Sequence, residues 1–174
     1  KFNLIEKIDY PNSIGMLYAT ITEYLGFQAN SDEWKVMAIS NLSGDSKKYY
    51  DIFRKNIVNY NSNGDYDINL KYFNSYYPLK PRLYSNHLID LLGKKNNNSN
   101  NPTKKQKDIA NALQKITTEI IQNKIKFFVN KTSIKNICCS GGVFMNCLMN
   151  GYLERKLNDC KIYVPYAPDD SGNS

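Results

Sequence analysis

The chain has 174 residues, enough for one domain that buries a substantial core, and 41% of them are hydrophobic. Its formal net charge of +7 would suit a polyanionic partner, but the lysines are interspersed with asparagines instead of forming an aromatic-studded basic stripe, so we expect no nucleic-acid partner. No apolar run approaches the roughly 18 residues that a membrane span needs, so we expect no membrane association.

The first predicted element is a helix that begins after Pro11. Asn12 or Ser13 can cap its start, and Gly26 marks its end. Its apolar positions recur at helical spacing and are Ile14, Leu17, Ile21, Tyr24 and Leu25. This face is expected to point into the core.

Two further helices and a strand follow. Ser31 can cap a short helix that carries Asp32 and Glu33 in its first turn, where negative charge is favourable. A longer helix is predicted over residues 44–59. The alternation of apolar and polar residues over 66–70 predicts a short strand.

A long helix is predicted after Pro102 and Thr103, and it should run to about Asn130. Apolar residues recur on one of its faces, whereas lysines occupy the others. The preceding segment 94–102 is rich in asparagine and is predicted to be a low-complexity surface loop within the same domain.

The C-terminal region is predicted to form a strand, a turn, a helix and a second strand. The corresponding stretches are SIKNICCS, then GGVFMNCLMNGYLERKL, then CKIYVP. This order is typical of an α/β unit with a parallel sheet. Cys138 and Cys139 would face opposite sides of the first strand. Because the four cysteines lack the C-x-x-C spacing of a zinc site, a reducing, cytoplasmic setting is expected.

The turn of this unit contains the only Gly-Gly pair of the chain, Gly141 and Gly142. Glycines at the carboxyl end of a strand let backbone N–H groups approach a ligand closely, and the start of a helix presents unpaired N–H groups. Such a turn suits a phosphate group. Close packing of the backbone is the alternative explanation, so the glycine pair alone leaves the function open.

Four stretches, taken in order, carry a more specific signal. They are YPNSIGMLYATITEYLGFQANSDEWKVMAIS, DIANALQ, CCSGGVFMNCLMNGYL and PYAPDDSG. Together they resemble the motifs of the NodU/CmcH-type O-carbamoyltransferase family, including its I-A-x-x-x-Q, G-G-V-A-x-N-x-x-x-N-x-x-L and P-x-x-x-D-x-G patterns. The chain departs from the family at Asn12, where a histidine is usual after the proline.

The resemblance implies an α/β fold of the actin-like ATPase (ribonuclease H-like) type, rich in helices and with a short, mostly parallel sheet. Residues 1–174 would form the later half of the family's N-terminal domain, which is related to glycoprotease and threonylcarbamoyl-transferase proteins. A chain that starts at Lys1 rather than Met agrees with a fragment. The YrdC-like domain that follows in the family is missing from this chain.

In that family the YrdC-like domain converts carbamoyl phosphate and ATP into carbamoyl adenylate. The N-terminal domain then transfers the carbamoyl group to an acceptor hydroxyl. The resemblance therefore implies ATP-dependent carbamoyl transfer to a small-molecule acceptor, with ATP and a divalent metal, iron or magnesium, as cofactors. The fragment alone is expected to be inactive, and the sequence assigns no catalytic residue.

The resemblance also nominates binding residues. Those expected against the nucleotide are Gly141, Gly142, Asn146 and Gly172. Asp170 is expected to ligate the metal, and the adjacent Asp169 is the alternative if the motif is shifted by one residue. Glu33 and Lys35 are expected to orient substrate or ATP, with an ion pair on the helix face as the alternative. The only histidine, His87, lies outside the motifs and is expected to be an ordinary polar or core residue.

Two other functions remain compatible with the sequence. One is tRNA threonylcarbamoyl transfer, whose enzymes share G-G-V-x-x-N but carry D-N-G where this chain has Asp170, Ser171 and Gly172. The other is a non-catalytic nucleotide-binding or scaffold module that keeps the glycine turn without the chemistry.

Overall fold

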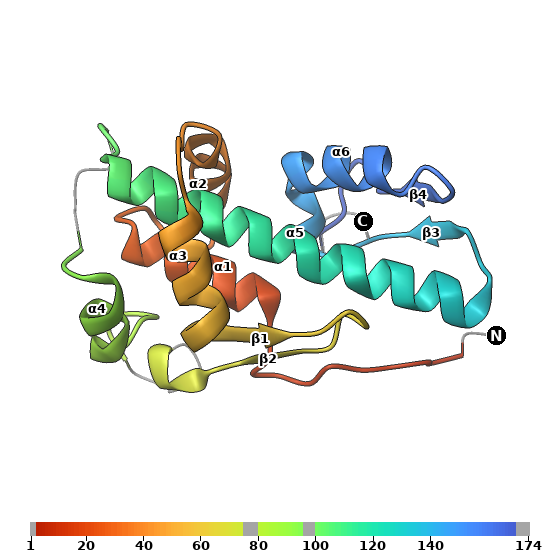
Figure 1. Ribbon diagram of the computed structural model, residues 1–174, viewed down its shortest axis with the longest axis horizontal. Coiled ribbons are helices and arrows are strands. Elements are labelled where there is room, and N and C mark those ends of the chain that lie inside the picture. Colours follow the sequence, from red (N-terminus) through yellow and green to blue (C-terminus); the bar gives the residue numbers. More distant parts are fainter. Residues whose placement is uncertain (1–2, 75–79, 96–99, 170–174) are drawn as a thin grey trace.

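The computed structural model describes residues 3–74, 80–95 and 100–169 (Figure 1). Its α-helices are α1 (Ile14–Tyr24), α2 (Glu33–Ser40), α3 (Lys47–Ile52), α4 (Asn86–Leu92), α5 (Lys104–Thr132) and α6 (Cys147–Lys156). Its strands are β1 (Val58–Tyr60), β2 (Tyr66–Ile68), β3 (Asn136–Cys138) and β4 (Lys161–Tyr163). Three short helical segments complete it: the π-helix η1 (Phe53–Ile57) and the 3-10 helices η2 (Leu70–Tyr72) and η3 (Gly142–Met145).

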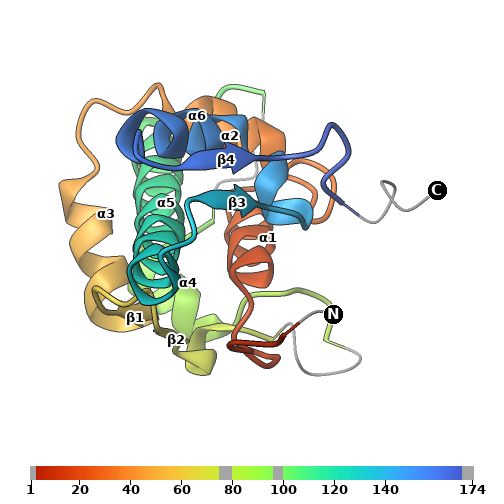
Figure 2. The same cartoon turned by 90° about the vertical axis from the view of Figure 1, so that its right-hand side faces the viewer.

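The long helix α5 organises the fold, as its predicted length suggested. Its 29 residues correspond to about 44 Å, and it extends along the long axis of the molecule (Figure 1). A capping box fixes its start, because Thr103 accepts from the backbone N–H of Gln106 and the Gln106 side chain accepts from the backbone of Thr103. Helices α1 to α4 surround its N-terminal half, and the unit of β3, α6 and β4 lies along its C-terminal half (Figures 1 and 2).

The main hydrophobic core lies where α1, α2, η1 and α4 meet the N-terminal half of α5. The large aliphatic side chains that α5 contributes are all fully buried and are Ile109, Leu113, Ile116 and Ile120. Each is expected to stabilise the fold by about 2 kcal/mol through removal of its apolar surface from water. A smaller cluster under α6, built on Met149 and Leu153, fastens the C-terminal unit to the other end of α5.

The fold is α/β and rich in helix, but the expectation of one short, mostly parallel sheet was wrong for the described residues. They contain two separate two-stranded sheets. β1 and β2 are antiparallel, with Val58 opposite Ile68, because a tight turn joins them. β3 and β4 are parallel, with Ile137 opposite Ile162, because α6 crosses over between them.

The predicted helix over 44–59 was wrong at both ends. The helical region starts at Lys47 and closes with η1 at Ile57, after which Val58 begins strand β1. β-branched and aromatic residues favour an extended backbone here, and pairing with β2 supplies the hydrogen bonds that a longer helix would have made.

The starts of two other helices also needed correction or refinement. Ser31 does not cap α2, because Asp32 occupies that position and its carboxylate accepts from the backbone N–H of Gln28. For α1 the structure selects Ser13, whose hydroxyl accepts from the backbone N–H of Met16. The other candidate, Asn12, instead accepts from the backbone of β2.

A half-buried lysine of α5, Lys124, connects this helix to the N-terminal segment and to the β1–β2 turn. Lys124 Nζ lies 2.5 Å from a carboxylate oxygen of Glu6 and 2.9 Å from one of Asp65. Hydrogen bonding from Lys124 is the main reason that the pKa of Asp65 lies below its usual range. The charged carboxylate of Asp65 is therefore favoured by folding.

This ion pair predicts a pH dependence of stability. A lowered folded-state pKa gives a contribution that is complete above the ordinary carboxyl pKa of about 4 and is lost as the pH falls through the folded value. The variant Lys124→Met should be less stable than the wild type at pH 6, and the difference should shrink as the pH falls below about 4. Urea unfolding at a series of pH values measures it, and a difference that stays constant over this range would contradict the assignment.

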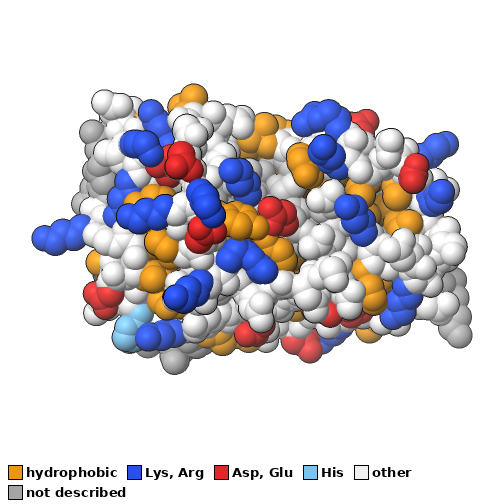
Figure 3. Space-filling model, viewed as in Figure 1, with side chains coloured by type: hydrophobic (Ala, Val, Ile, Leu, Met, Phe, Trp, Pro, Cys, Tyr) orange, Lys and Arg blue, Asp and Glu red, His pale blue; other side chains and the backbone are white. Residues whose placement is uncertain are grey.

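Basic, acidic and apolar side chains are interspersed over the face shown in Figure 3. The single histidine, His87, is an exposed residue near the start of α4, in agreement with an ordinary polar role. Among the helices of the described residues, none combines the length and the apolar character needed to cross a membrane.

Candidate functional site

The glycine turn follows β3 and is tied to the segment that leads to the predicted metal ligand. Gly141 has a φ of +104°, a conformation that favours glycine. Its backbone N–H donates to the carbonyl of Pro168 at 2.5 Å, and the Ser140 hydroxyl donates to the same carbonyl at 2.8 Å. Residue 169 is thereby brought next to the turn. The predicted ligand Asp170 and the predicted nucleotide residue Gly172 lie outside the described residues.

The turn is open on its outer side. Gly141 and Gly142 are exposed, and a Cβ atom added to either would meet no atom within 4 Å. Within the described part of the chain, the backbone N–H groups of Gly142 and Val143 have no acceptor. Unpaired backbone donors in an exposed turn are typical of phosphate sites, so this turn is the candidate site for a phosphate group.

The structure refines the expected helix start after the glycines. The 3-10 helix η3 intervenes, and α6 begins only at Cys147. The Asn146 side chain caps α6, since its Oδ1 accepts from the backbone N–H of Met149 at 3.0 Å. Asn146 therefore has a structural task at the end of the turn, in addition to any contact with a ligand.

Beneath the turn lies a buried polar cluster of Tyr18, Gln114 and Asn146. Gln114 Nε2 donates to Asn146 Oδ1 at 3.0 Å, and Asn146 Nδ2 donates back to Gln114 Oε1 at 2.9 Å. The Tyr18 hydroxyl donates to Gln114 Oε1 at 3.0 Å. Burial is the main cause that raises the pKa of Tyr18 well above its usual range, and the negative charge of nearby Glu33 adds to it.

The two residues nominated on α2 have separate partners. Lys35 Nζ lies 2.8 Å from Asp32 Oδ1, whereas Glu33 Oε1 accepts from the backbone N–H of Asn30 at 2.6 Å. An ion pair on the helix face is thus present, but it joins Lys35 to Asp32 and not to Glu33. Glu33 is the one whose charge acts on the buried cluster, through Tyr18.

Three of the four sequence stretches meet directly, and the fourth is attached to them. α1 contributes Tyr18, and α5 contributes Gln114 to the cluster that holds Asn146. α2 reaches the start of α6, where Met37 Sδ lies 3.8 Å from Cys147 Sγ. The fourth stretch joins through the hydrogen bonds of its Pro168 carbonyl. Segments far apart in the sequence therefore form one site around the glycine turn.

Comparison with known proteins places this arrangement in a family. The carbamoyltransferase N-terminus family matches residues 2–174. The chain belongs to this family. The resemblance of its four stretches to carbamoyltransferase motifs is thereby confirmed.

The alignments with individual relatives cover nearly the whole of this chain. The uncharacterized protein sll1178 of Synechocystis sp. is 30% identical over 169 residues, which are 97% of this chain and 27% of the relative. The nodulation protein NolNO of Sinorhizobium fredii is 29% identical over 161 residues, 92% of this chain and 22% of the relative. The nodulation protein NolO of Bradyrhizobium diazoefficiens is 26% identical over 171 residues, 97% and 28% of the two chains. The chain thus spans about a quarter of the length of these relatives.

The sequence analysis of this carbamoyltransferase N-terminal domain did not nominate two residues of the site, Tyr18 and Gln114. Tyr18 has the spacing of a core residue on α1, and it is in fact buried, but its hydroxyl belongs to the polar cluster. Gln114 ends the DIANALQ stretch and interrupts the apolar pattern of α5. The sequence did offer a signal for Gln114, because a polar residue at a buried helical position needs a hydrogen-bond partner.

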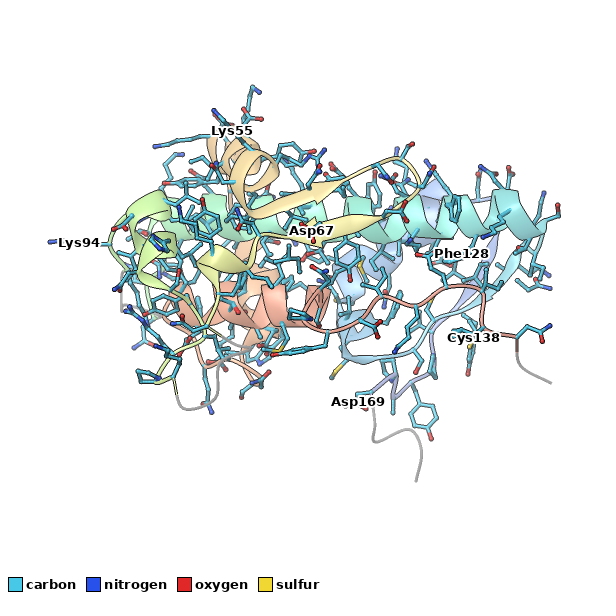
Figure 4. The ribbon with its side chains drawn as sticks, turned by 90° about the horizontal axis from the view of Figure 1, so that it is seen from below. Lys55, Asp67, Lys94, Phe128, Cys138 and Asp169 are labelled. Carbon is cyan, nitrogen blue, oxygen red and sulfur yellow. The ribbon has the colours of Figure 1, made fainter. Side chains whose placement is uncertain are left out.

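Of the two candidate metal ligands, Asp169 belongs to the described residues and Asp170 does not. Across residues 3–74, 80–95 and 100–169, no three His, Cys, Asp or Glu side chains are grouped closely enough to hold a metal ion. Figure 4 shows Asp169 and Cys138 on one side of α5 and Lys55 on the other. Cys138 is exposed and Cys139 is buried, which agrees with their predicted placement on opposite sides of the strand. Burial, followed by the neighbouring Cys138, raises the pKa of Cys139 to about 11, so its thiol is a poor nucleophile.

A separate hollow of about 530 Å³ lies between α3 and the opposite face of α5. Its lining is polar and includes Ser46, Lys115 and Glu119. None of the nominated residues within the described ranges lines it, so the glycine turn remains the candidate site.

Proposed function

We propose that the full-length protein is an ATP-dependent O-carbamoyltransferase and that this chain supplies part of its N-terminal domain, with the actin-like fold of that domain. The observation that carries the proposal is the convergence of all four family stretches on one open glycine turn. In the proposed reaction an acceptor hydroxyl oxygen bonds to the carbamoyl carbon of carbamoyl adenylate. The bond from that carbon to the phosphate oxygen breaks, AMP leaves, and the hydroxyl proton passes to solvent.

Carbamoyl adenylate would come from carbamoyl phosphate and ATP on a YrdC-like domain elsewhere in the protein. The proposed acceptor is a small molecule with a free hydroxyl, and the proposed compartment is the cytoplasm. A reducing compartment is consistent with four unpaired cysteines.

Several of the nominated residues have a proposed task in nucleotide binding. The N–H groups of Gly142 and Val143 would donate to phosphate oxygens, as preorganised donors do at other anion sites. Asn146 and Gly172 would line the nucleotide, and Glu33 would orient it from α2. Support for the glycine turn comes from its open outer side and its unpaired donors.

We further propose that Asp170 ligates a divalent cation, iron or magnesium. When bound, such a cation would neutralise phosphate charge and polarise the carbamoyl carbonyl. The hydrogen bonds of the Pro168 carbonyl, which hold the preceding residues beside the turn, support the placement.

The test uses the full-length protein with ATP, carbamoyl phosphate and a panel of hydroxylated acceptors. The expected results are carbamoyl-phosphate-dependent release of AMP and a mass increase of the acceptor by one carbamoyl group. Asp170→Ala should lower kcat/KM by at least about 100-fold, because charge stabilisation by a metal is worth several kcal/mol.

Asp169→Ala is the matched control, and it should retain most of the activity. Loss of activity only in Asp169→Ala would move the metal assignment to that residue, and full activity in both variants would remove it. ATP binding without any turnover that depends on carbamoyl phosphate would instead support a non-catalytic nucleotide module.

A further inference from the structure

We propose that Gln114 is a positioning residue for the nucleotide-facing turn, acting through Asn146; this inference rests on the proposed function of the turn. Gln114 lies in the middle of α5 with only 8% of its surface exposed. Both polar atoms of its side chain are hydrogen-bonded to groups outside α5. Burying an amide costs free energy, and a leucine would fill the same space without polar groups. Packing alone therefore does not explain a buried glutamine that is bonded to two other elements.

The hydrogen-bond pattern allows one orientation of each amide. The backbone N–H of Met149 needs an acceptor, so Asn146 must turn its Oδ1 toward α6 and the Nε2 of Gln114. Asn146 Nδ2 then faces Gln114 Oε1, which also accepts from the Tyr18 hydroxyl. Rotating either amide by 180° would set donor against donor and acceptor against acceptor. The cluster therefore holds Asn146 in a single orientation.

Hydrogen bonds at both ends hold the turn. At its start the backbone of Gly141 is bonded to Pro168, and at its end Asn146 is bonded to Gln114. Between them the N–H groups of Gly142 and Val143 have no acceptor among the described residues. Donors held in place before a ligand arrives bind it more tightly, because less ordering remains to be done on binding. Gln114 supplies this preorganisation from α5 through its two hydrogen bonds to Asn146.

The decisive variants change Gln114 in two ways. Gln114→Ala removes both bonds to Asn146. Gln114→Glu keeps the side-chain volume and the acceptors for Tyr18 and Asn146 Nδ2, but it places an oxygen against Asn146 Oδ1. Gln122→Ala is the matched control, because Gln122 is a half-buried glutamine two turns further along α5.

In the full-length protein, both Gln114 variants should raise the KM and the Kd for ATP about tenfold, the effect of losing roughly one to two net hydrogen bonds. The kcat at saturating ATP and the KM for the acceptor should change less than about threefold. Amide hydrogen exchange should quicken at residues 142–149 and stay unchanged in the middle of α5. Gln122→Ala should match the wild type in every measurement.

A purely structural role would lower kcat through a smaller active fraction and leave the KM for ATP unchanged, and that result would overturn the inference. If Gln114→Ala does not fold, Gln114→Glu decides alone, since it retains the volume. A wild-type protein that binds no ATP would overturn the proposed function together with this inference. Wild-type ATP binding with unchanged binding in both folded variants would overturn this inference only.

Discussion

Replacing Gly142 with valine in the full-length protein is expected to lower the affinity for ATP by at least about 100-fold while the domain stays folded. The domain should tolerate the valine, because Gly142 is exposed and a Cβ atom at this position meets nothing within 4 Å. Two methyl groups would, however, occupy the space in front of the N–H donors of Gly142 and Val143, where the phosphate is proposed to bind. A loss of about 2.7 kcal/mol in binding corresponds to this factor.

Isothermal titration with ATP measures the effect, and urea unfolding checks that the variant is folded. The matched control is Gly151→Ala within α6, whose added Cβ would meet only the flexible end of Arg155 at 3.3 Å. An alanine in a helix interior is favourable by about 0.5–1 kcal/mol, so this control should bind ATP normally. Unchanged ATP affinity in Gly142→Val would place the phosphate elsewhere.

Replacing Gly64 with alanine is expected to lower the free energy of unfolding by about 3 kcal/mol, a large share of the stability of a typical domain. Gly64 lies in the β1–β2 turn with a φ of +73°, where a side chain is strained. Its added Cβ would lie 2.3 Å from the backbone nitrogen of Lys124 in α5. Because a helix backbone cannot yield locally, the turn would have to move away from α5.

Hydrogen exchange in the presence of urea, followed at the amides of α5, measures this loss in the full-length protein. Gly44→Ala is the matched control, because a Cβ there meets nothing within 4 Å and Gly44 does not require a positive φ. Its effect should stay within about 0.5 kcal/mol. Equal stability of the two variants would show that the turn does not depend on its contact with α5.

The sequence predicted those elements whose signals are local. α5 has a capping box at its start and a regular apolar face, and its 29 residues form a long helix. The strand, turn, helix and strand of the C-terminal unit were likewise confirmed, including the parallel pairing of β3 and β4. Family membership could be predicted from short motifs, because a motif is recognised from the order of its residues and needs no knowledge of their positions in space.

Predictions failed where a competing partner was distant in the sequence. Val58 left the predicted helix because Ile68 offered a strand partner. The capping role predicted for Ser31 failed for a local reason instead, because the neighbouring Asp32 occupies that position. The hydrogen bond of the Tyr18 hydroxyl could not be predicted either. Helical spacing indicates which face of a helix is buried, but not which distant residue a polar side-chain tip contacts.

For this protein, the sequence by itself determined the long helix α5, the glycine turn and the family to which the chain belongs. Only the tertiary structure showed that Tyr18, Gln114 and Asn146 share one buried cluster beneath that turn. The reason is physical: caps, turns and periodicity act between residues a few positions apart, whereas Tyr18 and Gln114 are separated by 96 positions and meet only after the helices pack. Packing therefore decided how the turn is held, and with it how the proposed nucleotide site is preorganised.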